Sequence, residues 1–240
     1  PEGVILLTGP SGSGKTTTLY AALAHIREQA IARSMVSVED PVERRIRGVT
    51  QTEVNPGAGL DFTAALRSLL RQDPDVILIG EVRTRETMEH AITFSETGHL
   101  VLSTLHTNDA ISSADRLLDM GAEGYLIAAS LQAVIAQRLV RRICDSCKTS
   151  YSPDLQERSW LAAIGQDTGQ QVFQQGSGCP QCNNTGYSGR IGVYEYMEPS
   201  EAMLDALRRS DAAGFAALHT ASVGPVQDFG FMMATGSLLV

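Results

Sequence analysis

The stretch ILLTGPSGSGKTTTLYAAL, residues 5–23, decides the fold. Gly9, Gly14, Lys15 and Thr16 complete the pattern G-x-x-x-x-G-K-[ST], with an apolar run before it and a helix-forming run after it. In such a loop, glycines let backbone N–H groups surround a phosphate, and the start of the helix adds partial positive charge. The order strand, loop, helix therefore predicts a phosphate site. The alternative is a turn rich in glycine and serine that matches by chance.

Different residues of the loop are expected to bind different parts of the nucleotide and its metal. Lys15 is predicted to reach the β- and γ-phosphates, and Thr16 to hold Mg²⁺. The expected nucleotide-binding residues form one continuous segment: Gly9, Pro10, Ser11, Gly12, Ser13, Gly14, Lys15, Thr16 and Thr17. ATP and Mg²⁺ are therefore the first expected cofactors.

Hydrolysis of a nucleotide also needs carboxylates that organise Mg²⁺ and water. Residues 35–38 form an apolar run that ends in Glu39 and Asp40, and residues 76–79 form another that leads to Glu81. In open α/β sheets, ligands bind beyond the carboxyl ends of the strands, which is where these acids fall. Each acid alone could belong to a turn or to a solvated loop. Together with the phosphate loop, they predict a hydrolytic site.

A histidine ends a further apolar run in HLVLSTLHTNDA, residues 99–110. Residues 100–105 are predicted to form a buried strand that ends before His106, and Asp109 can cap a following helix. A histidine in this position is usually a packing residue. Because the phosphate loop and both acids are expected at the same sheet edge, we interpret His106 as a contact of the γ-phosphate or of the attacking water.

The four cysteines form two C-x-x-C pairs, Cys144 with Cys147 and Cys179 with Cys182. Two such pairs are typical of a structural zinc site with four thiolate ligands. Residues 154–165, in the long segment between the pairs, are expected to form a small helix. Disulfides are the alternative, and a reducing compartment disfavours them.

Composition limits the classes of protein that remain. The 240 residues are 43% hydrophobic and 19% charged, which suits a globular protein, and the net charge of −8 argues against a broad nucleic-acid surface. Residues 125–140 are the longest apolar stretch, and we interpret them as a buried or amphipathic helix and not as a membrane span. No signal peptide is recognisable. The chain begins one strand before the phosphate loop, so we expect a piece of a longer protein.

The motifs together resemble the secretion ATPase superfamily, and most closely its type II secretion and type IV pilus assembly ATPases (GspE/PilB-like). The resemblance rests on GPSGSGKTTTLYA at 9–21, VEDPVE at 38–43 and the segment 66–110, and it extends to about Glu198. These motifs match the family's Walker A motif, Asp box, atypical Walker B motif and His box.

The resemblance implies an α/β fold with three parts. We expect a RecA-like P-loop NTPase core over 1–143, a small four-cysteine zinc-binding subdomain over 144–190, and a C-terminal strand with a helical segment over 191–240. N-terminal domains are expected upstream of the chain. Ser200 is expected to cap a helix. The tail after residue 220 departs from the family pattern.

Carried over by motif, the resemblance assigns three catalytic residues. Glu39 belongs to the acidic shell of metal and water, Glu81 activates or positions water, and His106 contacts the γ-phosphate region. His99 also falls in the His box, but it is expected at the opposite sheet edge. Four arginines either act across a subunit interface or form surface ion pairs: Arg67, Arg71, Arg83 and Arg85.

The function implied is that of an ATP-hydrolysing motor for a type IV pilus or a type II secretion pseudopilus. A homo-hexamer is expected in the bacterial cytoplasm, held at the inner membrane through a platform protein. The zinc module favours pilus extension or secretion over retraction. One alternative is a ring ATPase that moves nucleic acid, against which the acidic composition counts, so no nucleic-acid partner is expected. The other is a nucleotide-binding scaffold without turnover, against which the intact Glu39 and Glu81 count.

Overall fold

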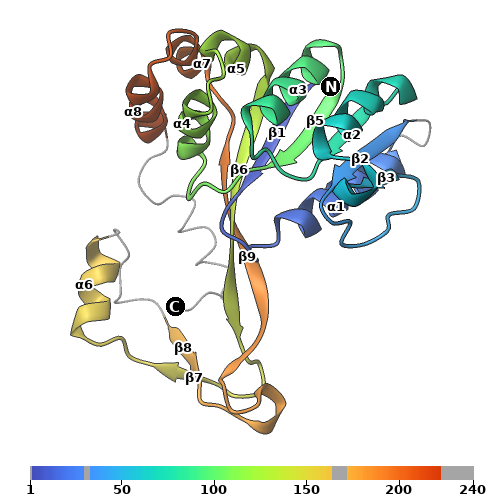
Figure 1. Cartoon of the computed structure of the whole chain (residues 1–240). Helices are drawn as coiled ribbons and strands as arrows, with labels where there is room; N and C mark the ends of the chain where they lie inside the picture. The colour runs from blue at the N-terminus through green and yellow to red at the C-terminus, as the bar shows by residue number, and fades with distance from the viewer. Residues whose placement is uncertain (1, 30–32, 164–171, 223–240) are drawn as a thin grey trace. The chain divides into compact units, whose positions relative to one another are not determined.

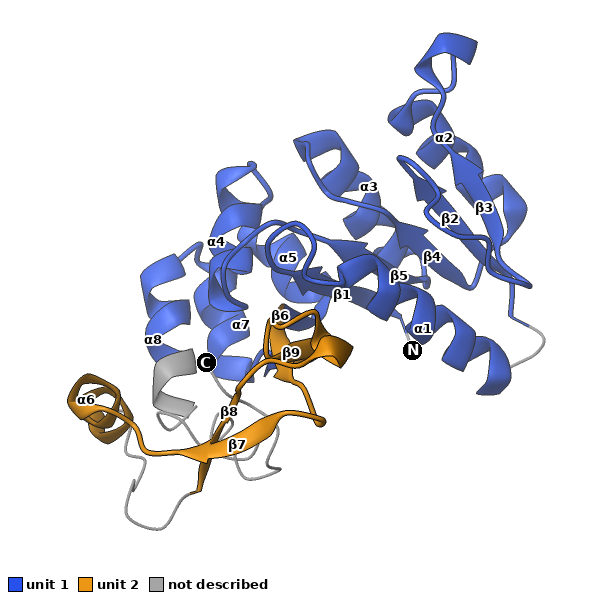
Figure 2. Ribbon diagram, turned by 90° about the horizontal axis from the view of Figure 1, so that it is seen from below, with its two compact units in different colours: residues 1–137, 194–219 blue, residues 138–193, 220–240 orange. Residues whose placement is uncertain are grey.

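The computed structural model describes residues 2–29, 33–163 and 172–222, with the side chains of 219–222 left out (Figure 1). The chain divides into two compact units (Figure 2). The first joins Pro1–Gln137 to Tyr194–His219, and the second is built on Arg138–Val193.

A seven-stranded sheet is the centre of the fold, in the order β3-β2-β4-β5-β1-β6-β9. Every neighbouring pair from β3 to β6 is parallel. Its strands are β1 Gly3–Thr8, β2 Met35–Glu39, β3 Thr50–Glu53, β4 Val76–Ile79, β5 Leu100–Thr104, β6 Leu131–Ile143 and β9 Tyr187–Met197. Because parallel strands end at one edge, the residues that follow β1, β2, β4 and β5 share a rim.

Helices cover both faces of this sheet, as a parallel sheet requires. Those of the first unit are α1 Lys15–Gln29, α2 Phe62–Leu69, α3 Arg85–Glu96, α4 Ile111–Asp119, α5 Gly124–Ser130, α7 Glu201–Arg208 and α8 Ala212–Ser222. In β4, Ile77 and Ile79 join the apolar cluster under α2 and α3, whereas Val76 and Leu78 join the cluster under α1. The strand is therefore buried on both sides, which explains its unbroken apolar sequence.

The predicted fold class is confirmed, and so are the four strands expected near the site. One prediction is wrong. Residues 125–140 were expected to form one helix, but α5 ends at Ser130 and β6 begins at Leu131. An apolar run by itself does not distinguish a buried helix from a buried strand. The deciding contact is tertiary, because β6 pairs in parallel with β1 and buries Val134 completely.

The second unit holds a small antiparallel pair, β7 Lys148–Tyr151 with β8 Phe173–Gly176. Helix α6, Leu155–Ala163, confirms the expected small helix between the cysteine pairs. In the first unit, the Ser200 side chain accepts a hydrogen bond from the backbone N–H of Met203 at 3.4 Å, so it caps α7 as predicted. Within the described residues, none of the helices has the length and apolar character to cross a membrane. Of the atypical tail, residues 223–240 lie outside the described part.

Candidate nucleotide site and cysteine cluster

The loop between β1 and α1 has the backbone of a phosphate cradle. Gly9 and Gly12 have φ angles of +140° and +77°, a region that L side chains rarely adopt. A Cβ atom at Gly9 would also clash with the carbonyl oxygen of Gln137 on the neighbouring strand. Helix α1 begins at Lys15, so its free N–H groups and its positive end face the loop.

Lys15 turns its side chain back over this loop. Its Nζ donates hydrogen bonds to the carbonyl oxygens of Gly9 at 2.8 Å and Pro10 at 3.2 Å. Burial lowers the pKa of Lys15, and the negative charge of nearby Glu81 opposes that shift. The hydroxyl of Ser13 is buried and has no hydrogen-bond partner among the described residues. These observations fit a loop that takes a phosphate ligand, because such a ligand supplies acceptors for the lysine and the hydroxyl.

Gln137 also holds the phosphate loop, and sequence reasoning missed it. It lies on β6 and is buried. Its amide donates to the carbonyl oxygen of Ser13 at 2.8 Å and accepts from the hydroxyl of Thr18 at 2.9 Å. One side chain therefore joins the loop to the helix that follows it. The apolar run around Gln137 was interpreted as a helix, which hid the signal of a lone amide in a buried strand.

Glu81 and His106 come together at the rim, as the strand ends predict. His106 Nε2 lies 3.1 Å from one carboxylate oxygen of Glu81, and Arg83 Nε lies 2.7 Å from the other. The Glu81 side chain is 22% exposed and that of His106 is 42% exposed, so a bound ligand can reach both. The negative charge of Glu81 opposes the lowering of the Lys15 pKa, so the two side chains are close enough to interact electrostatically.

Glu39, the last residue of β2, lies much deeper than Glu81 and is only 3% exposed. The hydroxyl of Ser37 donates to its Oε1 at 2.6 Å, and the amide of Gln51 donates to the same oxygen at 3.1 Å. Its Oε2 accepts a hydrogen bond from the hydroxyl of Tyr20 on α1. Sequence reasoning placed Glu39 at this rim but did not identify these three donors.

His99 lies at the other end of β5, where its ring nitrogen Nδ1 is 2.7 Å from the carbonyl oxygen of Phe94. Two of the four arginines form exposed ion pairs: Arg67 with Glu86 at 3.2 Å and Arg85 with Glu89 at 2.7 Å. For these two the surface ion pair is the observed arrangement. Arg83, in contrast, contacts a residue of the rim.

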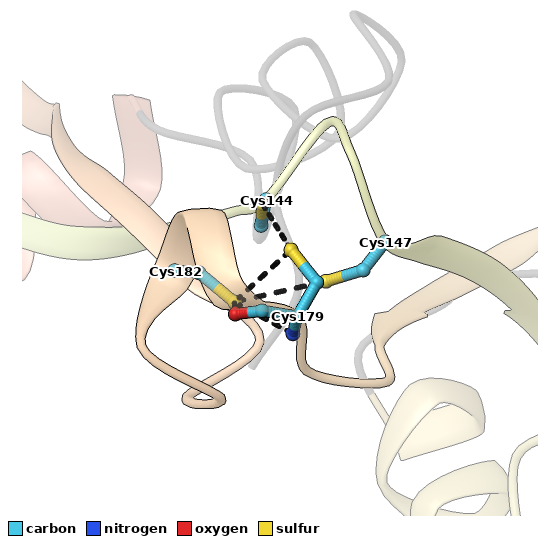
Figure 3. A group of neighbouring side chains, drawn as sticks. All are labelled: Cys144, Cys147, Cys179 and Cys182. Carbon is cyan, nitrogen blue, oxygen red and sulfur yellow. Dashed lines mark hydrogen bonds between the residues drawn. The ribbon is translucent and has the colours of Figure 1, made fainter.

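The four cysteines form one cluster in the second unit (Figure 3). All four Sγ atoms lie within 4.8 Å of one another. The Sγ atoms of Cys144 and Cys179 are 3.8 Å apart, as are those of Cys147 and Cys182, whereas a disulfide needs about 2.05 Å. Backbone N–H groups of Cys179 and Gly186 donate to the Cys182 sulfur at 3.2 and 3.3 Å. This arrangement fits a four-thiolate metal site and excludes the disulfide alternative in this structure.

The fold and the site together define a P-loop nucleotide-binding protein with an α/β core and a cysteine module. Comparison with known proteins narrows this class. The family model described as "Type II/IV secretion system protein" matches residues 1–223, so the chain belongs to that family. The family resemblance seen in the sequence motifs is thereby confirmed.

Several curated relatives are similar over most of this chain. The type II secretion system ATPase E of Vibrio cholerae is 46% identical over 203 residues, which are 85% of this chain and 40% of that protein. The type II secretion system protein HxcR of Pseudomonas aeruginosa is 50% identical over 195 residues, 81% of this chain and 37% of that protein. The type IV pilus assembly ATPase PilB of Myxococcus xanthus is 47% identical over 199 residues, 82% of this chain and 35% of that protein. The chain thus spans about two fifths of the length of these relatives.

Solved structures show the same fold. The pilus retraction motor PilT with bound ADP superposes with a TM-score of 0.70 at 29% identity, over 100% of this chain and 59% of that one. The Legionella pneumophila ATPase DotB superposes with a TM-score of 0.69 at 22% identity, over 99% of this chain and 58% of that one, and supports the fold alone.

Proposed function

We propose that the chain is the ATP-hydrolysing part of a motor that powers assembly of a type IV pilus or a type II secretion pseudopilus. The observation that carries the proposal is the position of Glu81. Its carboxylate lies 3.1 Å from His106 Nε2 at the end of the neighbouring strand, and its charge acts on Lys15 of the phosphate loop. The names of the relatives support the same assignment, since they include secretion ATPases and a pilus assembly ATPase.

In this proposal the residues of the phosphate loop and the rim have separate roles in hydrolysis. The backbone of the loop and Lys15 bind the phosphates, and Thr16 is the protein ligand of Mg²⁺. Mg²⁺, when bound, neutralises the charge that develops on the transferring phosphate. Glu81 orients the attacking water and accepts its proton, while His106 contacts the γ-phosphate end. Glu39 organises the water around the metal from a deeper position.

We propose zinc as the resident metal of the cysteine cluster. The support is the set of four thiol groups within 4.8 Å of one another, supplied by two C-x-x-C turns. Four protein ligands fill a tetrahedral zinc site, so the metal has a structural role and offers no position to substrate. We retain the three-part division at 144 and 191 as the proposed domain organisation.

The whole motor is proposed to be a homo-hexamer in the bacterial cytoplasm, attached to the inner membrane through a platform protein. The family membership supports this arrangement. Of the two alternatives, the scaffold without turnover predicts ATP binding but no phosphate release. The nucleic-acid motor predicts turnover that rises when DNA is added.

The test is ATP turnover by the purified chain, with and without DNA. Lys15→Ala should abolish binding of a fluorescent ATP analogue, because it removes the cation that faces the phosphates. Glu81→Gln should bind the analogue normally and lose turnover, since the amide fills the same space but cannot accept a proton. Arg208→Gln, on an exposed ion pair of α7, is the control. Wild-type turnover in Glu81→Gln would refute the assignment of Glu81, and stimulation by DNA would favour the nucleic-acid motor.

A further inference from the structure

Tyr20 is a buried residue of the Walker A segment to which the motifs assign no role. It lies on α1, one helical turn after Thr16, and its side chain is only 2% exposed. Residues four apart on a helix share a face, so Tyr20 lies on the side of α1 that carries the proposed Mg²⁺ ligand. From there its hydroxyl donates to Oε2 of Glu39 on β2. A residue of the phosphate-binding helix therefore holds a carboxylate of the hydrolytic rim.

The two carboxylate oxygens of Glu39 differ in how many of their acceptor positions are filled by hydrogen bonds. A carboxylate offers about four acceptor positions, two on each oxygen. Ser37 and Gln51 fill both positions of Oε1. Oε2 receives only the hydroxyl of Tyr20 among the described residues, which leaves one position open on that atom. Tyr20 therefore contacts the oxygen that remains able to accept from water.

Glu39 depends on these neutral donors, because no described Lys, Arg or His forms an ion pair with it. A buried carboxylate without a cation is costly unless its oxygens are hydrogen-bonded. Burial, and then the hydrogen bond and charge of Glu39, raise the pKa of Tyr20 to about 12, so the hydroxyl keeps its proton and acts as the donor. The guanidinium of Arg44 lies 5.8 Å from the centre of the Tyr20 ring and covers it.

We propose that Tyr20 is a positioning residue for ATP hydrolysis: its hydroxyl fixes the orientation of Glu39 so that the open position of Oε2 points to the catalytic water. The inference rests on the proposed function, in which Glu39 organises that water. Tyr20 does not contact the nucleotide in this scheme. Its loss should therefore lower kcat and leave KM for ATP nearly unchanged.

The experiment measures ATP turnover and ATP-analogue binding by the 240-residue chain and its variants. Tyr20→Phe keeps the buried ring and removes only the donor, and it should lower kcat about 10–100-fold, with KM changed less than about threefold. Ser37→Ala should have a smaller effect, because Gln51 still donates to the same oxygen. Tyr194→Phe removes the hydroxyl of a half-exposed tyrosine and serves as the matched control.

The double variant Tyr20→Phe with Glu39→Gln separates positioning from stability. If Tyr20 acts through Glu39, the double variant should turn over ATP at the rate of Glu39→Gln alone. Multiplied losses, together with a lower melting temperature, would indicate a structural role and overturn the inference. Near wild-type kcat in Tyr20→Phe, with Glu39→Gln inactive, would also overturn it while leaving the proposed function intact. Normal turnover in Glu39→Gln itself would instead refute the role proposed for Glu39.

Discussion

At the residue scale, the two carboxylates of the rim have different surroundings. Glu81 is partly exposed and contacts two groups that carry or can take positive charge, His106 and Arg83. Glu39 is buried and contacts neutral donors. Glu81 is therefore the more accessible of the two carboxylates for a bound ligand, whereas Glu39 is held in a buried position by its hydrogen bonds.

His106 offers a direct test of this arrangement. His106→Ala should lower kcat roughly 10–100-fold and change ATP affinity much less, because the ring is proposed to contact only the transferring end of the nucleotide. Steady-state turnover and analogue binding measure the two effects separately. His99→Ala is the control, since that ring lies at the opposite end of the same strand. Equal losses of ADP and ATP affinity with a lower melting temperature would instead indicate a packing histidine.

At the scale of elements, strand β6 contacts both the phosphate loop and helix α1. The strand lies beside β1, and its Gln137 contacts both the loop after β1 and the first turn of α1. The loop conformation thus depends on a strand more than a hundred residues later in the chain. We therefore expect Gln137 to help hold the glycine-rich loop in its observed conformation.

Gln137→Leu should raise the dissociation constant for ATP about tenfold and lower the melting temperature. The leucine fills similar space but leaves the Ser13 carbonyl without its donor, and an unpaired buried polar group costs about 1–3 kcal/mol. Titration with a fluorescent ATP analogue measures the first effect and thermal unfolding the second. Gln132→Leu, at an exposed position of the same strand, is the matched control. Unchanged affinity in Gln137→Leu would show that the loop keeps its shape without this contact.

The cysteine cluster also belongs to the scale of elements, and the metal content of the purified protein tests the proposal that it binds zinc. Elemental analysis should find about one zinc per chain, and Cys179→Ser should lose the metal and destabilise the second unit. Ser146→Ala changes an exposed residue of the first cysteine turn and should retain the zinc. Metal-free protein with the same unfolding transition as the wild type would contradict the zinc proposal.

At the scale of the whole molecule, the proposed ring predicts that activity depends on assembly. Arg83 contacts Glu81 within the chain, and Arg67 and Arg85 form surface ion pairs. The charge on the transferring phosphate is therefore expected to need a cation from another domain or subunit, which contributes about 10³–10⁵ in rate in related chemistry. The chain alone should bind ATP and hydrolyse it slowly.

Specific activity should rise with protein concentration, and more steeply in longer versions of the protein that include upstream domains. Sedimentation and turnover measured over the same concentration range would show whether assembly and activity rise together. Activity per chain that stays flat down to nanomolar concentration would contradict the ring.

The sequence by itself determined the parts that depend on local pattern. Three features were predictable in this way: the phosphate loop, the strands around it and the two C-x-x-C turns. Glycine spacing, apolar runs and C-x-x-C spacing all act over a few residues. The sequence also predicted that Glu81 and His106 lie on the same rim, since the ends of parallel strands share one edge, whereas their 3.1 Å contact is a finding of the structure.

Only the tertiary structure decided the contacts between segments that are distant in the chain. Residues 131–136 form a strand where they pair with β1, and an apolar run does not contain that information. The same holds for two hydrogen bonds between distant residues. Gln137 bonds to Ser13 of the phosphate loop, 124 residues away in the chain, and Tyr20 bonds to Glu39, 19 residues away. Such bonds form only where packing brings a buried donor to a buried acceptor, so their partners follow from the fold and not from local spacing.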